Sequence, residues 1–343
     1  MTTANQTANP QTANPQTASP QTASPILTVD LQQWRQGGDA AAQVCAAVDE
    51  SLQKAGFLLV TGHGIDPFLP AALRAAAREF FALPAEVKAQ YAVGVGGRGW
   101  IGPGLEANGY AEGTETPPDL KETYNSGAQT PVGIPEVDDY WFAPDVWPTE
   151  TPRLRELFTA WTSQMKALSD DLLALMAEAL GKAGEDNPFR GLAGNATWTS
   201  NINHYPPMTV VGDPEPGQFR IGPHTDFGTV TVLDREPGAG GLQVYSDESG
   251  WADAPYDPTA LTINIGDLLE YWSGGRWPAG RHRVLPPQPE SPEEDLVSLI
   301  FFYELDHGAV VTPLAPPVGR VSGRPDVIAG EFIKERLDAI TLG

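Results

Sequence analysis

The pattern of apolar residues changes its period near Asn195, and this change limits the folds that the chain can adopt. Beyond it, apolar and polar residues alternate in short runs separated by Gly, Pro or Asp, which is typical of β-strands joined by turns. Five such runs are expected to be strands: Trp198–Tyr205, Thr225–Leu233, Gly241–Tyr245, Ala260–Ile265 and Leu296–Leu305. We expect no helices between them, so the strands must bury their apolar faces against one another. This predicts an antiparallel sandwich or barrel.

The first half of the chain predicts helices together with two short strands. Apolar side chains recur at three- and four-residue steps from Leu154 to Leu180, which predicts a long helix over 150–183 that backs the core. Capping signals predict two more helices, one over Asp39–Ala55 with Gly56 as its stop and one from Asp66 to Phe81. The remaining elements are expected to be strands at Ile26–Leu31 and Phe57–Val60, a short helix after Pro84, an irregular glycine-rich stretch over 92–118 and a closing helix at Glu331–Leu337.

The first 25 residues repeat a five-residue unit that begins as Thr7-Ala8-Asn9-Pro10-Gln11. This segment has no charges and little apolar bulk, so we expect residues 1–25 to be a disordered, flexible tail. No clear linker divides the rest, and residues 26–343 are expected to form a single domain. Within it we expect an N-terminal α/β part over 26–195 and a β core over 196–320. The predicted fold class is α+β, mainly β, with N-terminal and backing helices.

Charge and composition exclude several classes of protein. The formal net charge is −23, which would repel the phosphates of nucleic acids and of anionic membranes, so neither is an expected partner. A single cysteine cannot form an intramolecular disulfide. No apolar run approaches the length of a membrane span, and the N-terminus lacks the pattern of a signal peptide. These features predict a cytoplasmic protein.

Three residues could together bind a metal ion: His224, Asp226 and His282. The tripeptide His224-Thr225-Asp226 carries little weight alone in so acidic a chain. It opens an expected strand, however, and residues i and i+2 of a strand project from the same face. Two neutral imidazoles and one carboxylate on one face of an octahedron leave three positions open. That arrangement suits Fe(II) that must bind both O₂ and an organic ligand.

Several segments resemble the isopenicillin N synthase-like family of non-haem Fe(II)/2-oxoglutarate-dependent oxygenases. They follow the family's order over about residues 26–320: Gly56–Gly64, Asp119–Glu122, Gly222–Leu233, Leu261–Leu269, Trp272–Arg276, His282–Val284 and Ser298–Phe302. The resemblance implies a double-stranded β-helix (jelly-roll) core, with His224, Asp226 and His282 as the ligands of Fe(II). It also implies that O₂ is used to hydroxylate, desaturate or cyclise a small molecule, such as a specialised metabolite or an amino-acid-like compound.

The resemblance further implies residues for the organic ligand, and here the chain departs from the family. Asn203 and Tyr205 match the family's Asn-x-Tyr strand, and Ser298 matches the serine of its Arg-x-Ser pair. Leu296 stands where that arginine is expected, and a leucine cannot make a charge-assisted contact with a carboxylate. The departure puts the binding of 2-oxoglutarate in question.

Two alternatives follow from Leu296. In the first, which the family favours, the enzyme uses 2-oxoglutarate and another cation holds its distal carboxylate. The candidate cations are Arg220, Arg235, Arg281 and Arg283. In the second, the enzyme is an oxidase of the isopenicillin N synthase type, in which the substrate itself supplies all the electrons for O₂.

Two further classes of function are compatible with a jelly roll. The first is a non-catalytic binding protein, although binding alone gives no reason to keep three convergent metal ligands. The second is a zinc hydrolase, whose usual ligand sets are three histidines, two histidines with a glutamate, or cysteine-rich combinations. Neither fits the sequence as well as a non-haem Fe(II)-dependent oxidoreductase.

Overall fold

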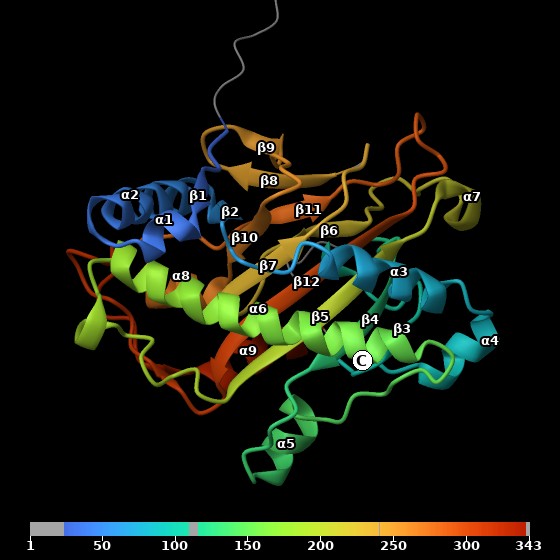
Figure 1. Cartoon of the computed structure of the whole chain (residues 1–343), viewed down its shortest axis with the longest axis horizontal. Helices are drawn as coiled ribbons and strands as arrows, with labels where there is room; N and C mark the ends of the chain where they lie inside the picture. Colours follow the sequence, from blue (N-terminus) through green and yellow to red (C-terminus); the bar gives the residue numbers. More distant parts are fainter. Residues whose placement is uncertain (1–23, 110–115, 240, 341–343) are drawn as a thin grey trace, which may run out of the picture.

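The computed structural model describes residues 24–109, 116–239 and 241–340, so the expected tail over 1–25 lies almost entirely outside the described residues. Within this part of the chain, the strands form a large sheet, a smaller sheet and an isolated pair (Figure 1). The large sheet has the order β1 (Thr28–Asp30), β2 (Phe57–Thr61), β10 (Leu261–Ile265), β7 (Val230–Asp234), β12 (Leu296–Asp306), β5 (Ala196–Tyr205), β4 (Glu122–Gly127) and β3 (Trp100–Ile101). The smaller sheet has the order β6 (Ile221–His224), β11 (His282–Val284), β8 (Leu242–Ser246) and β9 (Gly250–Asp253), and the pair is β13 (Val310–Val311) with β14 (Val327–Ile328).

The second half of the chain passes repeatedly between the two sheets. From β5 to β12 it enters the large sheet at β5, β7, β10 and β12 and the smaller sheet at β6, β8, β9 and β11, and neighbouring strands in this set are antiparallel. This alternation is that of a jelly roll. The predicted fold class is therefore confirmed.

Strands from the first half extend the large sheet at both edges. β2 pairs with β10, and β4 pairs with β5, so the jelly roll is flanked on each side by N-terminal strands. The helices are α1 (Leu31–Arg35), α2 (Gly38–Ala55), α3 (Leu69–Phe81), α4 (Ala85–Lys88), α5 (Pro135–Trp141), α6 (Pro152–Ala179), α7 (Met208–Val211), α8 (Asp267–Trp272) and α9 (Ala329–Ile340). In the described residues, none of these helices is both long and apolar enough to cross a lipid bilayer.

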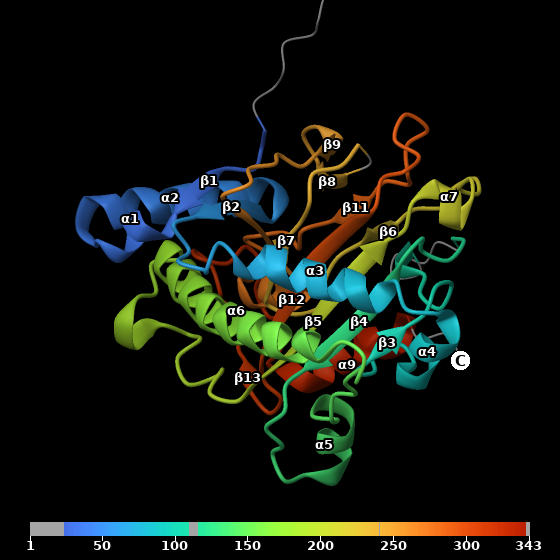
Figure 2. The same cartoon turned by 45° about the vertical axis from the view of Figure 1, so that its right-hand side comes forward.

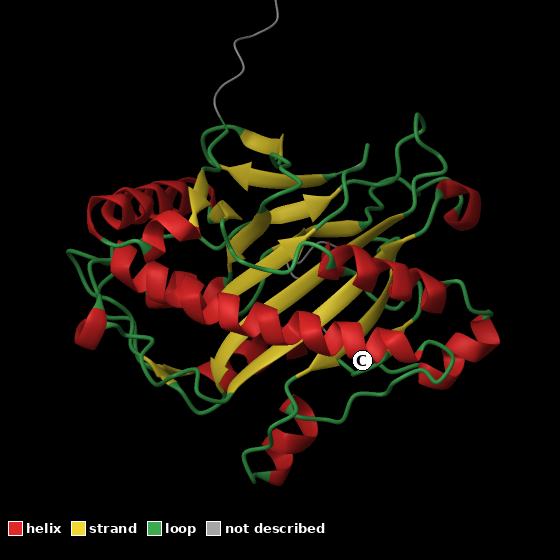
Figure 3. Ribbon diagram, in the orientation of Figure 1, coloured by secondary structure: helices red, strands yellow, loops and turns green. Residues whose placement is uncertain are grey.

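The long helix predicted over 150–183 is observed as α6, and it lies across the large sheet (Figure 3). Its apolar stripe is fully buried at Phe158, Trp161, Met165 and Leu172. It packs against α2 and α3 and contacts β7 and β12, and Figure 2 shows α3 beside it over the same sheet. Because these side chains exclude water from the outer face of β7 and β12, α6 fixes the strands whose inner face lines the site described below.

Two predicted helix starts differ from the observed ones, by one residue in α2 and by three residues in α3. α2 begins at Gly38, so Asp39 lies in its first turn rather than at the cap. α3 begins at Leu69, because the Asp66 side chain accepts a hydrogen bond from the Phe68 amide (2.9 Å) and closes a separate turn before the helix. The predicted stop at Gly56 is confirmed: this residue has φ 69°, and a Cβ atom there would lie 2.4 Å from the Pro278 carbonyl oxygen.

The single strand predicted over 225–233 is wrong, and so is the expected absence of helices between strands. The chain leaves β6 at His224 and enters β7 only at Val230, so Asp226 lies in a loop between the two sheets. The Thr229 carbonyl in this loop accepts a hydrogen bond from the Gly266 amide (3.0 Å), just before α8. α7 and α8 were missed because helices of four and six residues are too short to show a helical period.

The burial of α6 yields a stability prediction. Leu172→Ala removes a fully buried side chain that packs in the main core and should lower the free energy of unfolding by about 2 to 5 kcal/mol. Ser163→Ala, on the exposed face of the same helix, should change it by less than about 0.5 kcal/mol. Urea denaturation followed by circular dichroism measures both, and equal effects would contradict the assigned face.

Candidate active site

A cavity lies between the two sheets, and alternate residues of the facing strands line it. In the large sheet these are Asn203 and Tyr205 of β5, Thr231 and Leu233 of β7, Asn264 of β10, and Leu296, Ser298, Ile300 and Phe302 of β12. In the smaller sheet they include Ile221 and His224 of β6, Leu242 of β8, and His282 and Val284 of β11. Because strand residues two apart share a face, the cavity is the inside of the jelly roll. Its wall combines apolar side chains with a small polar group around Asp226.

The structure brings His224, Asp226 and His282 together at this cavity. His224 is the last residue of β6 and His282 the first of β11, and the two face each other directly across this antiparallel strand pair. Their ring centroids are 4.3 Å apart. One ligand atom from each of the three residues lies within 4.8 Å of the other two, which is close enough for a single metal ion to be shared.

The orientation of both imidazoles is set by backbone carbonyls. The Nδ1–H group of His224 donates to the Gly222 carbonyl oxygen (2.8 Å), and that of His282 donates to the Gly280 carbonyl oxygen (2.9 Å). A ring whose Nδ1 carries the proton keeps the lone pair of Nε2 free for a metal. The Nε2 atom of His224 lies 3.7 Å from Oδ1 of Asp226, so the free nitrogen points towards the carboxylate.

Asp226 presents one carboxylate oxygen to the histidines and uses the other to hold its position. Its Oδ2 atom accepts hydrogen bonds from the Thr231 hydroxyl (2.5 Å) and the Asn264 amide (2.6 Å). Burial raises the pKa of Asp226, but the two histidines and these hydrogen bonds outweigh burial and lower it overall. The side chain is therefore a carboxylate at neutral pH.

His282 is held in the neutral form. Burial, followed by the proximity of His224, lowers its pKa to about 4, although Asp226 acts in the opposite direction. A neutral imidazole and an ionised carboxylate are the protonation states in which these side chains bind metals. Electrostatics thus prepares the group for a divalent cation.

The loop that carries Asp226 rests against the junction of β10 and α8, which the sequence analysis missed. The Asp226 carbonyl accepts a hydrogen bond from the Asp267 amide (2.8 Å), and the Phe227 carbonyl accepts one from the Leu268 amide (3.1 Å). A Cβ atom on Gly266 would lie 2.5 Å from the Gly228 carbonyl oxygen, so only glycine permits this approach. The segment Asn264–Gly266 therefore has two roles: Asn264 binds the Asp226 carboxylate, and Gly266 allows the loop that carries Asp226 to pack against it.

The residues expected to bind the organic ligand meet on neighbouring strands. Ser298 of β12 is directly opposite Asn203 of β5, and Leu296 is directly opposite Tyr205. Burial raises the pKa of the Tyr205 phenol, although hydrogen bonds with Asn203 and Ser298 act against the rise. The phenol therefore keeps its proton, and its O–H group can donate a hydrogen bond to a carboxylate. Leu296 places an apolar side chain beside this donor.

The four candidate arginines lie in different surroundings. Arg235 lines the cavity. Arg220 is fully buried outside the cavity lining and forms an ion pair with Glu294 (2.7 Å). Arg281 and Arg283 flank His282 in sequence, so they project from the opposite face of β11, where both guanidinium groups lie over the Trp251 ring.

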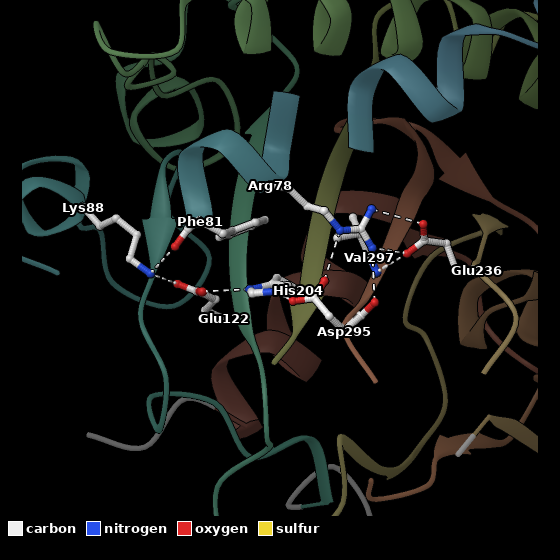
Figure 4. Close-up of polar contacts among 8 residues, drawn as sticks. All are labelled: Arg78, Phe81, Lys88, Glu122, His204, Glu236, Asp295 and Val297. Atoms are coloured by element: carbon white, nitrogen blue, oxygen red, sulfur yellow. Dashed lines mark hydrogen bonds and ion pairs between the residues drawn. The ribbon is translucent and has the colours of Figure 1, made fainter. Parts of the chain in front are cut away.

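A network of charged groups joins α3 to the strand ends beside the cavity (Figure 4). The His204 ring lies between Glu122 (2.9 Å) and Asp295 (2.9 Å) and stacks on Phe81. Arg78 binds Asp295 (3.1 Å) and both carboxylate oxygens of Glu236 (2.5 and 3.1 Å). Lys88 binds the other side of Glu122 at 2.7 Å. Glu236 directly follows Arg235, and Asp295 directly precedes Leu296. The network therefore fixes the strand ends at which Arg235 and Leu296 lie.

A jelly roll that holds two imidazoles and a carboxylate inside its barrel defines the class of non-haem Fe(II) oxygenases. Sequence comparison agrees: the family described as the 2OG-Fe(II) oxygenase superfamily matches residues 199–305, and the family described as the N-terminal region of non-haem dioxygenases in morphine synthesis matches residues 26–150. The chain belongs to the Fe(II)/2-oxoglutarate-dependent oxygenases. It is an oxidoreductase that uses Fe(II), 2-oxoglutarate and O₂ on a small molecule, as the resemblance implied.

Individual relatives cover most of the chain. Validamycin A dioxygenase of Streptomyces hygroscopicus subsp. limoneus is 40% identical over 91% of this chain and 86% of its own length. A homoarginine-6-hydroxylase of Arabidopsis thaliana is 29% identical over 80% of each chain. A solved 2OG-Fe(II) oxygenase family protein of Caulobacter crescentus has 28% identity and a TM-score of 0.76, and the match covers 91% of this chain and 98% of that one.

The charged network predicts how stability depends on pH. Burial lowers the pKa of His204, but its hydrogen bonds with Asp295 and Glu122 outweigh burial and raise the pKa above its usual value of 6.5. The protonated ring therefore stabilises the fold fully below about pH 6.5, and this contribution is lost as the pH rises through the raised value. The loss of unfolding free energy caused by His204→Gln should accordingly shrink as the pH rises above about 6.5.

Denaturation at several pH values measures this difference. His63→Gln is the control, because burial lowers the pKa of His63 and its contribution is constant above the usual value. A His204→Gln effect that stays constant over the same range would contradict a protonated His204.

Proposed function

We propose that His224, Asp226 and His282 hold Fe(II), and that Asn203, Tyr205 and Ser298 bind 2-oxoglutarate beside it. The observation that carries this proposal is the convergence of three ligand atoms within 4.8 Å at the wall of a cavity. The donor set suits the metal, because imidazole and carboxylate together bind iron and three coordination positions stay open for other ligands. The lowered pKa values of Asp226 and His282 supply the required protonation states.

Each residue has a distinct part in the proposed reaction. Bound Fe(II) and 2-oxoglutarate supply the chemistry, in which O₂ is activated, 2-oxoglutarate is decarboxylated to succinate and a C–H bond of the substrate is oxidised. Thr231 and Asn264 hold Oδ2 of Asp226, so that Oδ1 is directed at the metal. The Tyr205 O–H group donates a hydrogen bond to a carboxylate oxygen of the cosubstrate, and the Ser298 hydroxyl donates one from the adjacent strand.

The apolar part of the cavity wall has a second role in this proposal. Leu233, Leu242, Val284, Ile300 and Phe302 surround the polar centre. They exclude water from the site, which strengthens the electrostatic interactions inside it and protects the reactive oxidant from side reactions.

The substrate class in this proposal is a small specialised metabolite. It is supported by the names of the relatives, which act on validamycin A and on homoarginine and cover at least four-fifths of this chain. A cytoplasmic location, where iron and thiols stay reduced, is part of the same proposal. The single thiol, Cys45, is buried, which is compatible with it.

The metal assignment is tested by Fe(II) binding under anaerobic conditions. Asp226→Ala should lower the affinity for Fe(II) by more than about 100-fold, and Asn264→Leu by about 10- to 100-fold, because the second change frees the carboxylate without removing it. Asp247→Ala, in an exposed turn between β8 and β9, is the control and should bind iron like the wild type. Equilibrium dialysis with iron quantification measures all three. Normal iron loading of Asp226→Ala would refute the site.

The cosubstrate residues are tested by the visible charge-transfer band that Fe(II) and a bound 2-oxo acid produce together. Ser298→Ala should raise the dissociation constant of 2-oxoglutarate by about 3- to 10-fold, because one hydrogen bond to the ligand is lost. Iron affinity should stay unchanged. If the wild type binds iron but develops no band at high 2-oxoglutarate, the assignment of Asn203, Tyr205 and Ser298 fails while the metal assignment survives.

A further inference from the structure

The cosubstrate pocket has an apolar residue where a positive charge is needed. Leu296 and Ser298 project into the cavity from β12, and Leu296 is opposite the Tyr205 phenol. A dicarboxylate such as 2-oxoglutarate leaves one carboxylate at the far end from the metal. Burying that charge without a cation is unfavourable, so a positive group must come from another element.

Arg235 reaches the cavity from the strand next to β12. Thr231 and Leu233 of β7 line the cavity. Arg235 directly follows β7 and lies two residues after Leu233, so it lines the cavity on the same side. β7 pairs with β12 so that Asp234 is opposite Leu299. One step further along the chain, the carboxylate of Glu236 accepts a hydrogen bond from the Val297 amide (2.8 Å). The backbone of Arg235 therefore lies beside Ser298, on the strand next to the one that carries Leu296.

The guanidinium group of Arg235 is held in place but incompletely satisfied. Its Nη2 atom donates to the carbonyl oxygens of Ala254 (3.0 Å) and Pro255 (2.8 Å). Its Nε atom is buried and has no hydrogen-bond partner among the described residues. Within the same described residues, no carboxylate lies within ion-pair distance of this arginine, and burial lowers its pKa. A fixed, buried cation with an unused donor is suited to an anionic ligand.

Neighbouring acids do not cancel the charge of Arg235. Glu236 also lines the cavity, but both of its carboxylate oxygens are bound by Arg78 (Figure 4). Asp295, which precedes Leu296, binds the same Arg78 and His204. These carboxylates face cations on α3 and β5. Asp253 acts electrostatically on Arg235 but forms no ion pair with it among the described residues, so most of the positive potential of Arg235 is left for the cavity.

We propose that Arg235, which directly follows β7, binds the distal carboxylate of 2-oxoglutarate. It takes the role of the arginine that is expected on β12 at the position of Leu296. The inference rests on the proposed function, because it requires the cosubstrate to lie between the metal triad and Ser298. The other candidate arginines do not line the cavity: Arg220 is paired with Glu294 and lies over the ring of Tyr205 (5.8 Å) from outside the lining, and Arg281 and Arg283 lie over Trp251. Among the described residues that line the cavity, Arg235 is the only one with a positive charge.

The test compares two 2-oxo acids on the Fe(II)-loaded enzyme under anaerobic conditions, with the charge-transfer band as the readout. Arg235→Gln should raise the dissociation constant of 2-oxoglutarate by about 10- to 100-fold, because a charge-assisted hydrogen bond is lost. 2-Oxobutyrate has the same 2-oxo acid group and no distal carboxylate. It should therefore bind the variant and the wild type equally, and iron affinity should stay the same.

Arg283→Gln is the matched control. It removes an arginine next to His282, on the face of β11 away from the cavity, and should leave both dissociation constants at the wild-type values. If Arg235→Gln does not fold, Arg235→Lys keeps the charge and loses the planar fork. It should weaken 2-oxoglutarate by about 3- to 10-fold and leave 2-oxobutyrate unchanged.

Three results would overturn the inference: unchanged 2-oxoglutarate binding in Arg235→Gln, equal weakening of both 2-oxo acids, or an equal effect of Arg283→Gln. In each case the wild type still gives the band, and the proposed function stands without Arg235. If instead the wild-type enzyme binds iron but gives no band with either acid, the proposed binding of 2-oxoglutarate by Asn203, Tyr205 and Ser298 fails while the metal assignment survives, and the inference fails with the cosubstrate assignment.

Discussion

The antiparallel pairing of β6 with β11 is the constraint on which the candidate site depends. It sets His224 directly opposite His282, and the carbonyl oxygens of Gly222 and Gly280 then turn both rings so that their free nitrogens face the cavity. Asp226 joins them only because the chain leaves β6 at once and crosses towards the other sheet. The three metal-binding side chains thus converge for two reasons: the strand register pairs the two histidines, and the chain turns out of β6 directly after His224.

Charge is distributed in this structure according to the two faces of each strand. Among the described residues, the inner face of the jelly roll carries few charges: Asp226 at the metal group, Arg235, and Glu236, whose carboxylate is bound by Arg78. The other charged residues at the same strand ends are paired with α3 or lie on the outer face. A chain with a large negative net charge can in this way present a positive potential to an anionic cosubstrate.

Much of this fold follows from the sequence, since two-residue alternation predicts strands and the stripe from Leu154 to Leu180 predicts the backing helix. The choice of His224, Asp226 and His282 came from residue type and from a resemblance, but its geometric reason was wrong, because Asp226 lies outside any strand. The support of its loop by Gly266 could not be predicted, since it depends on a close approach between distant segments. The sequence names Arg235 only as one of four candidate cations, because its place beside Ser298 is set by strand register rather than by sequence spacing.

The contacts of Arg78 bear on how such enzymes can be recombined. The guanidinium group of Arg78 on α3 binds carboxylates at both strand ends beside the cosubstrate side of the cavity. The N-terminal helices therefore help to position the site, and they cannot be exchanged without affecting it. A chimaera that takes its first half from another oxygenase would keep the jelly roll of this chain but lose Arg78. Glu236 and Asp295 at the strand ends would then lack this cation. Grafting therefore has to carry Arg78, Glu236 and Asp295 together as one transferable unit.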